Sequence, residues 1–158
     1  MGDQNRTATA LIVLGCPQLP VQTSIALWLS HELRLRGVEV TICGTPSARK
    51  LVAVADPDSH YRGAMEDLDA CIGRLADGEA DYDCSVIFVH NDGGLSYAAT
   101  IASITDGLVV PVIYGENAAA LADSLPFDCR PAVAPATHNP GPLKRAIREV
   151  FPWDALNR

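Results

Sequence analysis

The stretch TALIVLGC, residues 9–16, is a continuous run of apolar, partly β-branched residues that only Thr9 and Gly15 interrupt. A strand exposed on one face alternates apolar and polar residues, whereas a continuous run is typical of a strand covered on both faces. Strands of that kind belong to parallel sheets with a layer of helices on each side. Residues 9–16 therefore predict a buried strand of an α/β fold.

The chain that follows this run changes to a helical pattern and back. Apolar residues recur at three- and four-residue steps from Val21 to Leu33, with polar residues such as Gln22 on the other side. This spacing predicts an amphipathic helix that ends near Gly37, a residue suited to a left-handed terminus. The run VEVTIC, residues 38–43, predicts a second strand. Strand, helix and strand in this order indicate a right-handed parallel crossover unit.

Further elements repeat the alternation. Strands are predicted at residues 85–90, 108–114 and, at the edge, 130–134, and helices at residues 46–53, 61–75, 95–102, 116–124 and 142–150. The fold class is therefore α/β: a three-layer α/β/α sandwich around a mainly parallel, Rossmann-like or flavodoxin-like sheet of about five strands. We expect a single domain over residues 1–158, long enough to bury a core without disulfides. Residues 1–7 are predicted to be a flexible N-terminus, and residues 126–158 a proline-rich segment with a C-terminal helix.

Composition argues against several classes of partner. The chain has 12 Lys and Arg against 19 Asp and Glu, a net charge of −7, whereas nucleic acids and anionic membranes require a basic face. The longest apolar run is too short to cross a membrane, and the polar residues 1–7 do not form a signal peptide. Five cysteines without a Cys-x-x-Cys pair argue against a disulfide framework or a zinc ribbon. Reduced thiols in the cytoplasm fit these observations.

The strand ends are where a ligand is expected. Open parallel sheets bind ligands beyond the carboxyl ends of their strands, at the point where the strand order reverses. The first and third predicted strands, residues 9–16 and 85–90, are neighbours in a flavodoxin-like order, so we expect the site where these two strands end. The expected ligand-binding residues are Gln18, Asn91, Asp92, Gly93, Gly94, Ser96, Tyr97 and Gly115, and the expected catalytic residues are Cys16 and His90.

Cys16 has two interpretations. It ends the first strand and precedes a helix, whose N-terminus can favour the reactive thiolate form. Residues 17–20 separate it from that helix, however, and a free cysteine is more commonly buried and inert. Cys43, Cys71 and Cys84 fall within strand or helix patterns and are predicted to lie in the core.

The segment HNDGGLSY, residues 90–97, carries the highest density of polar side chains after a strand. Asp92 can cap the helix that follows, and the two glycines after it can form a turn. A capping role for Asp92 with a glycine turn does not explain why His90 and Asn91 stand at the end of the strand. Two glycines at a helix start also suit an anion, although Asp92 supplies its own negative charge. His90 can serve as an acid, a base or a metal ligand.

No established cofactor or metal motif is present. The chain lacks a Gly-x-Gly-x-x-Gly after its first strand, a P-loop and a Gly-x-Ser-x-Gly elbow, so the cofactor stays unknown. His60 follows Asp56 and Asp58, but this spacing matches no metal site, and none is predicted.

Several short motifs, each weak alone, occur together in this chain. They are Gly15-Cys16-Pro17, Pro20-Val21-Gln22-Thr23, Asp56-Pro57, Asp67-Leu68-Asp69, and Val89-His90-Asn91-Asp92 with Ser96-Tyr97. In this combination the chain resembles a small family of archaeal proteins, mainly from methanogens, catalogued as a domain of unknown function. The resemblance covers about residues 11–115 and not the tail from residue 126 onward. It implies a Rossmann-like sandwich in a cytoplasmic archaeal protein, and it implies no reaction.

Three functional hypotheses follow from the sequence. The first is a small-molecule binding protein or enzyme, in which His90 acts as acid or base and Cys16 as nucleophile or thiol ligand. The second is a sulfur-handling accessory protein with a reactive Cys16. The third is an interaction or assembly subunit without chemistry, because no complete catalytic signature is present. The expected partners are a small-molecule ligand and a second copy of the chain in a homodimer.

Overall fold

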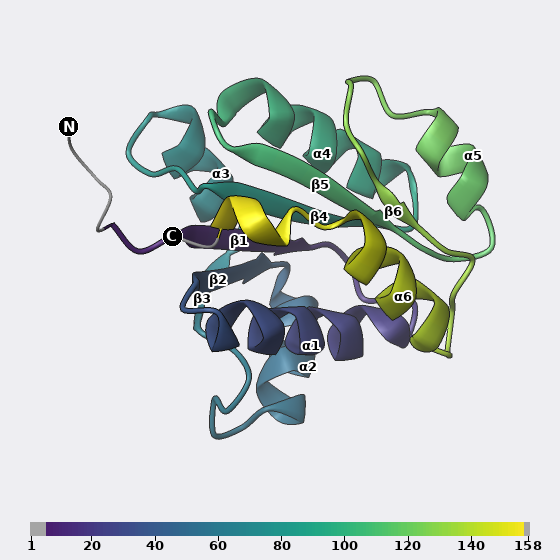
Figure 1. The fold of residues 1–158 in the computed structure, drawn as a ribbon, viewed down its shortest axis with the longest axis horizontal. Helices are drawn as coiled ribbons and strands as arrows, with labels where there is room; N and C mark the ends of the chain where they lie inside the picture. Colours follow the sequence, from purple (N-terminus) through teal and green to yellow (C-terminus); the bar gives the residue numbers. More distant parts are fainter. Residues whose placement is uncertain (1–5, 157–158) are drawn as a thin grey trace.

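A computed structural model describes residues 6–156, which form helices on both faces of one six-stranded sheet (Figure 1). The strands are β1 (Thr9–Leu14), β2 (Glu39–Gly44), β3 (Ala64–Asp67), β4 (Cys84–Val89), β5 (Leu108–Ile113) and β6 (Ala132–Val133). The helices are α1 (Val21–Leu35), α2 (Pro46–Ala55), α3 (Leu68–Ala76), α4 (Asp92–Ile104), α5 (Ala118–Asp123), α6 (Gly141–Val150) and the short 3₁₀ helix η1 (Trp153–Leu156). Of the N-terminus expected to be flexible, residues 1–5 lie outside the described residues.

The sheet is parallel throughout and has the strand order β3-β2-β1-β4-β5-β6. This is the doubly wound order, in which the chain builds outward from β1 in one direction, crosses back, and continues from β4 in the other. Without the edge strand β3 the remaining five strands have the flavodoxin-like order. The predicted fold class is therefore confirmed, with one more strand than expected.

The position of β1 between two layers of helices explains why its sequence is continuously apolar. Ala10, Ile12 and Leu14 belong to one core cluster, while Leu11 and Val13 belong to the other. The first cluster lies under α1, α2 and α6, and the second under α3, α4 and α5 (Figure 1). Because neighbouring residues of a strand face opposite sides, burial of both faces requires an apolar residue at every position.

One predicted helix is wrong in its first half. The stripe from Tyr61 to Leu75 predicted a single helix over residues 61–75, but residues 64–67 form the edge strand β3, which pairs with β2. The side chain of Asp67 accepts a hydrogen bond from the backbone N–H of Ala70 (3.1 Å) and so caps α3 at its start. The edge of β2 offers backbone partners to the residues before the cap, and this pairing outweighs the helical spacing.

Helix α4 begins directly against the end of β4. A Cβ atom at Gly94 would lie 2.9 Å from the Cα of Val89 and 3.2 Å from the carbonyl oxygen of Phe88, so only glycine permits this approach. The close contact holds the first turn of α4 at the carboxyl edge of the sheet.

None of the helices within residues 6–156 has the length and apolar character that a membrane span requires.

Candidate functional site at the carboxyl ends of β1 and β4

The strand order reverses between β1 and β4, which are paired neighbours in the sheet. The chain leaves β1 toward α1 on one face, and it leaves β4 toward α4 on the other face (Figure 1). Diverging connections of this kind open a crevice at the carboxyl edge of a parallel sheet. The structure thus brings together the two segments, residues 15–20 and 90–94, at which the sequence predicted a site.

Three polar side chains meet at this crevice. The Nε2 atom of His90 lies 3.0 Å from Oε1 of Gln18, although the two residues are 72 positions apart in the sequence. The Nδ2 atom of Asn91 lies 3.5 Å from both of these atoms. Gln18 and Asn91 are exposed and His90 is half-buried, so this cluster forms the rim of the crevice.

The inner side of the His90 ring contacts two buried polar residues. Its Nδ1 atom lies 3.2 Å from the hydroxyl oxygen of Tyr114, which follows β5, and the two rings are 5.3 Å apart. The Tyr114 hydroxyl donates to Oε1 of Gln22 (2.5 Å), and Nε2 of Gln22 donates to the carbonyl oxygen of Gly15 (3.0 Å). These contacts form a continuous line from the end of β1 to the crevice, which we call the Gly15–His90 relay.

The sequence had not assigned Gln22 or Tyr114 to the site. The helical pattern placed Gln22 on the polar side of α1, whereas its exposed fraction is 1% and Tyr114 is fully buried. The prediction for Gln22 is wrong because the first turn of α1 lies beside the end of β5, where the Tyr114 hydroxyl requires a partner. The available signal was Gln22 within the motif Pro20-Val21-Gln22-Thr23.

Burial keeps the ionisable groups of the relay neutral. Desolvation lowers the pKa of His90 below its ordinary value, because the charged imidazolium is the form that burial disfavours. Desolvation likewise raises the pKa of Tyr114 far above its ordinary value. Near neutral pH the relay therefore contains a neutral imidazole and a neutral phenol.

A small hollow of about 160 Å³ opens beside His90. Its lining residues are Gly15, Cys16, Thr45, Phe88, His90, Asn91, Gly93, Gly94 and Tyr97. They come from the ends of β1, β2 and β4 and from the first turns of α4. The volume is below the roughly 300–1,000 Å³ of pockets that enclose whole drug-sized ligands, so the hollow accommodates one chemical group rather than a large molecule.

Gln18, which contacts His90 at the rim of the hollow, also lines an apolar groove of about 440 Å³. One wall is the segment with Pro17, Leu19 and Pro20, and the other is the face of α2 with Leu51 and Val54. Val54 is 72% exposed, which is unusual for a branched aliphatic residue on a helix. Gln18 therefore connects the rim of the hollow, through its contact with His90, to the apolar groove.

The predicted site residues divide into three groups. Cys16, His90, Asn91, Gly93, Gly94 and Tyr97 line the hollow, and Gln18 contacts His90 at its rim. Gly115 is buried behind the ring, where a Cβ atom would lie 3.8 Å from Cβ of His90. Asp92 and Ser96 are exposed and lie outside the lining of the hollow.

The expected cap at Asp92 is wrong. Asn91 is the N-cap of α4, because its Oδ1 atom accepts a hydrogen bond from the backbone N–H of Gly94 (3.1 Å). Asp92 is the first residue of the helix and adds negative charge at the positive end of the helix dipole. Either residue type can cap a helix, so composition alone did not separate the two.

The other candidate groups stay apart from the crevice. Cys43, Cys71 and Cys84 are buried as predicted, whereas Cys16, which lines the hollow, is exposed. His60 is exposed, 3.9 Å from a carboxylate oxygen of Asp58. Within residues 6–156, no three His, Cys, Asp or Glu side chains are grouped so as to hold a metal ion.

The chain is similar in sequence to one described protein family and to a protein from a methanogen. A family model described as a domain of unknown function, DUF1890, matches residues 11–150. The uncharacterized protein MJ0452 of Methanocaldococcus jannaschii is 30% identical over 145 residues, which cover 90% of this chain and 97% of that protein. The resemblance to an archaeal family is therefore confirmed, and the match extends past residue 115, where the resemblance was expected to end, to residue 150.

Two solved structures extend this comparison. The structure of MT0777 has 37% sequence identity and a TM-score of 0.84, covering 92% of this chain and 99% of its own. A dodecameric FMN-dependent UbiX-like decarboxylase from Escherichia coli O157:H7 has 13% identity and a TM-score of 0.53, covering 89% and 93%. The second likeness, at this identity, shows the shared fold alone.

Proposed function

The chain belongs to the family described as a domain of unknown function, DUF1890, and we propose that it binds a small organic molecule in the crevice between β1 and β4. The observation that carries the proposal is the meeting of Gln18, His90 and Asn91 beside a hollow at the strand-order reversal. Polar side chains that converge at this position of a parallel sheet are typical of a ligand site.

The size and lining of the crevice limit the ligand. A volume of about 160 Å³ suits a polar group of a few non-hydrogen atoms, which the side chains of His90 and Asn91 can hydrogen-bond. The remainder of the molecule extends past Gln18 over the apolar groove beside Leu51 and Val54. A compound with one polar group and an apolar body fits both parts.

The chemistry available at the hollow is that of a neutral imidazole and a thiol. His90 can accept a proton from a bound group, and Cys16 lines the same hollow as a nucleophile or a thiol ligand. The FMN dependence of the Escherichia coli decarboxylase belongs to that protein, and the hollow here is too small to enclose a flavin. Because all five cysteines are free thiols, we place this function in the cytoplasm.

A thermal-shift screen tests the proposal. The purified protein is heated with carboxylic acids, amines, alcohols, thiols, nucleotides, FMN and divalent metal ions. We expect at least one organic compound to raise the melting temperature by roughly 5–10 °C, because a ligand at 100 times its Kd contributes about 2.7 kcal/mol. The shift should disappear in His90→Ala.

The control variant is His60→Ala, since this histidine is exposed and is not among the residues that line the hollow or the groove. It should keep the full shift. If no organic compound raises the melting temperature, or if the shift survives in His90→Ala, the proposal is wrong. A screen in which no organic compound raises the melting temperature would favour the third hypothesis, an interaction or assembly subunit without chemistry.

The exposed thiol of Cys16 makes sulfur handling the second candidate. Among the five cysteines, three are buried, and Cys16 is the one that lines the hollow. In the same screen, stabilisation by thiol compounds that is lost in Cys16→Ser but kept in His90→Ala would favour this candidate over the first.

A further inference from the structure

We infer that Gln22 and Tyr114 are positioning residues that hold the proton of His90 on Nδ1, so that Nε2 offers a lone pair to a ligand that donates an N–H or O–H group. Which nitrogen of His90 carries the proton follows from the Gly15–His90 relay alone. The class of ligand, by contrast, rests on the proposed function.

The argument starts at the carbonyl oxygen of Gly15, which can only accept a hydrogen bond. The side-chain amide of Gln22 lies 3.0 Å from it, so the NH₂ end of the amide must face this oxygen. Turning the amide around would place two acceptors against each other. Because Gln22 is 1% exposed, water cannot compensate for that loss. The Oε1 atom of Gln22 therefore faces Tyr114.

The Tyr114 hydroxyl carries one proton, and the orientation of Gln22 decides where it goes. Oε1 of Gln22 is an acceptor at 2.5 Å, so the hydroxyl donates to it. The hydroxyl oxygen is then left to accept from its other neighbour, Nδ1 of His90 at 3.2 Å. In a neutral imidazole the proton on Nδ1 is the only ring N–H, and Nε2 is an acceptor.

Asn91 supports the same assignment from the outer side of the ring. Its Oδ1 atom is held by the backbone N–H of Gly94 at the cap of α4, so its Nδ2 donor faces outward. That donor lies 3.5 Å from Nε2 of His90 and 3.5 Å from Oε1 of Gln18, so it is placed to donate to a lone pair on Nε2 when Gln18 turns away. The relay thus assigns the proton at Nδ1, and the Asn91 amide held by the cap of α4 is compatible with that assignment at Nε2.

Gln18 is the adjustable end of the arrangement. Its Oε1 atom lies 3.0 Å from Nε2 of His90, an orientation that suits a proton on Nε2, so the inferred tautomer requires the exposed amide of Gln18 to turn and present its NH₂ group to the lone pair. A ligand that donates N–H or O–H to Nε2 replaces this contact, and its remaining atoms can lie along the apolar groove that Gln18 also lines. The lone pair selects donor ligands and disfavours groups that can only accept.

Gly115 completes the wall behind the ring. Its φ angle of +93° lies in a region that side chains rarely adopt. A Cβ atom there would lie 3.1 Å from Leu19, on the segment that carries Gln18. Glycine at this position lets residues 15–20 pack beside His90.

Nuclear magnetic resonance of protein with ¹⁵N-labelled histidine tests the inference without a ligand. Two-bond proton–nitrogen correlations distinguish the two neutral tautomers, and the His90 signal is identified by its absence in His90→Gln. We expect His90 to carry its proton on Nδ1 in the wild-type protein. In Tyr114→Phe, which removes the acceptor and keeps the ring, we expect the His90 proton to move to Nε2.

The signals of His31, His60 and His138 serve as internal controls, since unchanged positions show that Tyr114→Phe keeps the fold. Gln22→Leu should move the His90 proton in part, because the Tyr114 hydroxyl is then free to donate toward Nδ1. A wild-type His90 with its proton on Nε2, or a tautomer unchanged in Tyr114→Phe, would overturn the inference. Because no ligand is present, this result is separate from failure of the thermal-shift screen.

Discussion

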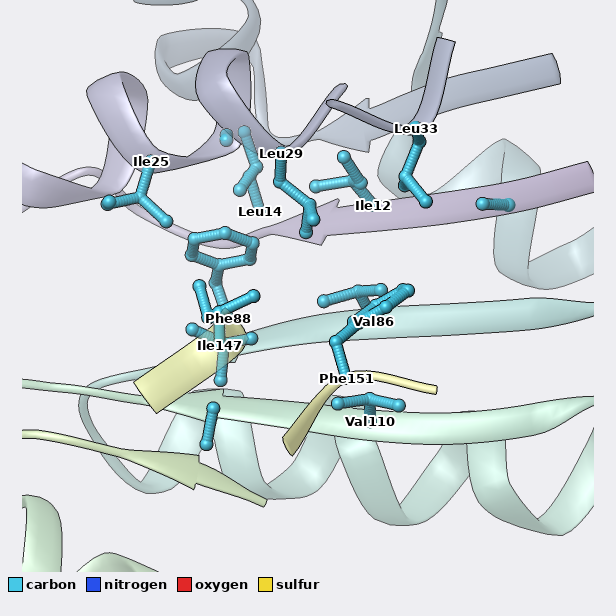
Figure 2. Close-up of a cluster of buried hydrophobic side chains, with 14 of the residues drawn as sticks. Ile12, Leu14, Ile25, Leu29, Leu33, Val86, Phe88, Val110, Ile147 and Phe151 are labelled. Carbon is cyan, nitrogen blue, oxygen red and sulfur yellow. The ribbon is translucent and has the colours of Figure 1, made fainter. Parts of the chain in front are cut away.

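Replacing Phe88 by alanine is expected to lower the free energy of unfolding by about 3–5 kcal/mol, the usual cost of removing a buried aromatic ring. Phe88 is 2% exposed and points from β4 into the core cluster beneath α1 and α6. Figure 2 shows its ring among Leu14, Ile25 and Ile147. These residues come from three different elements, which cannot all move inward to fill the cavity.

The effect should extend to the site. The Phe88 ring lies 6.1 Å from the ring of Tyr114 and also lines the hollow beside His90. Its loss therefore loosens Tyr114 and deepens the hollow. Urea denaturation measures the change, with Leu108→Ala as control, because Leu108 is 46% exposed at the start of β5. A loss in Phe88→Ala no larger than in Leu108→Ala would contradict this packing.

Replacing Asp56 by asparagine is expected to lower the free energy of unfolding by about 3 kcal/mol, since each hydrogen bond to a buried carboxylate contributes roughly 1.5–3 kcal/mol. The residue is 2% exposed and follows α2. Its carboxylate accepts backbone N–H groups of His60 (2.8 Å), Tyr61 (3.0 Å) and Arg62 (3.0 Å). An asparagine side chain would turn a donor toward at least one of these groups.

This loss should depend on pH. Burial alone raises the pKa of Asp56, but the three backbone N–H groups and the charge of Arg62 more than offset it, so the pKa lies below the ordinary 3.8. A carboxyl group with a lowered pKa in the folded state stabilises the fold above the pKa of the unfolded chain. That contribution is lost as the pH falls through the folded-state value.

The difference in stability between the wild type and Asp56→Asn should therefore be full near pH 7 and shrink below about pH 4. Denaturation across this range measures it. The matched control is Asp58→Asn, two residues away, whose side chain is 79% exposed. An equal loss in both variants, or a difference that grows toward low pH, would show that Asp56 does not organise this loop.

Much of the fold could be predicted from the sequence because the two central strands are almost continuous apolar runs, with Ser85 as the one polar residue of β4. Residues 9–14 and 84–89 are covered on both faces, and no other element type fits such a run at this length. Strand β3 could not be found in the same way, because its residues AMED are only partly buried at the edge. Their pairing with β2 is a long-range contact that local spacing does not contain.

The place where the candidate site residues meet could be predicted for a similar reason. Once the strands are placed, topology alone brings residues 15–18 and 90–94 to one edge of the sheet. The inner half of the site could not be predicted, because Gln22 has a polar side chain in an ordinary helical pattern. Its burial depends on Tyr114, 92 positions later, and that contact exists only in the folded chain.

The central claim is that the hollow beside His90 receives a ligand, and crystals soaked with small organic fragments test it most directly. The account predicts that fragments carrying an N–H or O–H group appear in this hollow, with the donor within hydrogen-bond distance of Nε2 of His90. Fragments confined to the opposite end of the sheet, near Asp81, Asp83 and Asp106, would contradict it. So would a soaked hollow in which Gln18 keeps its contact with His90 and no fragment is bound.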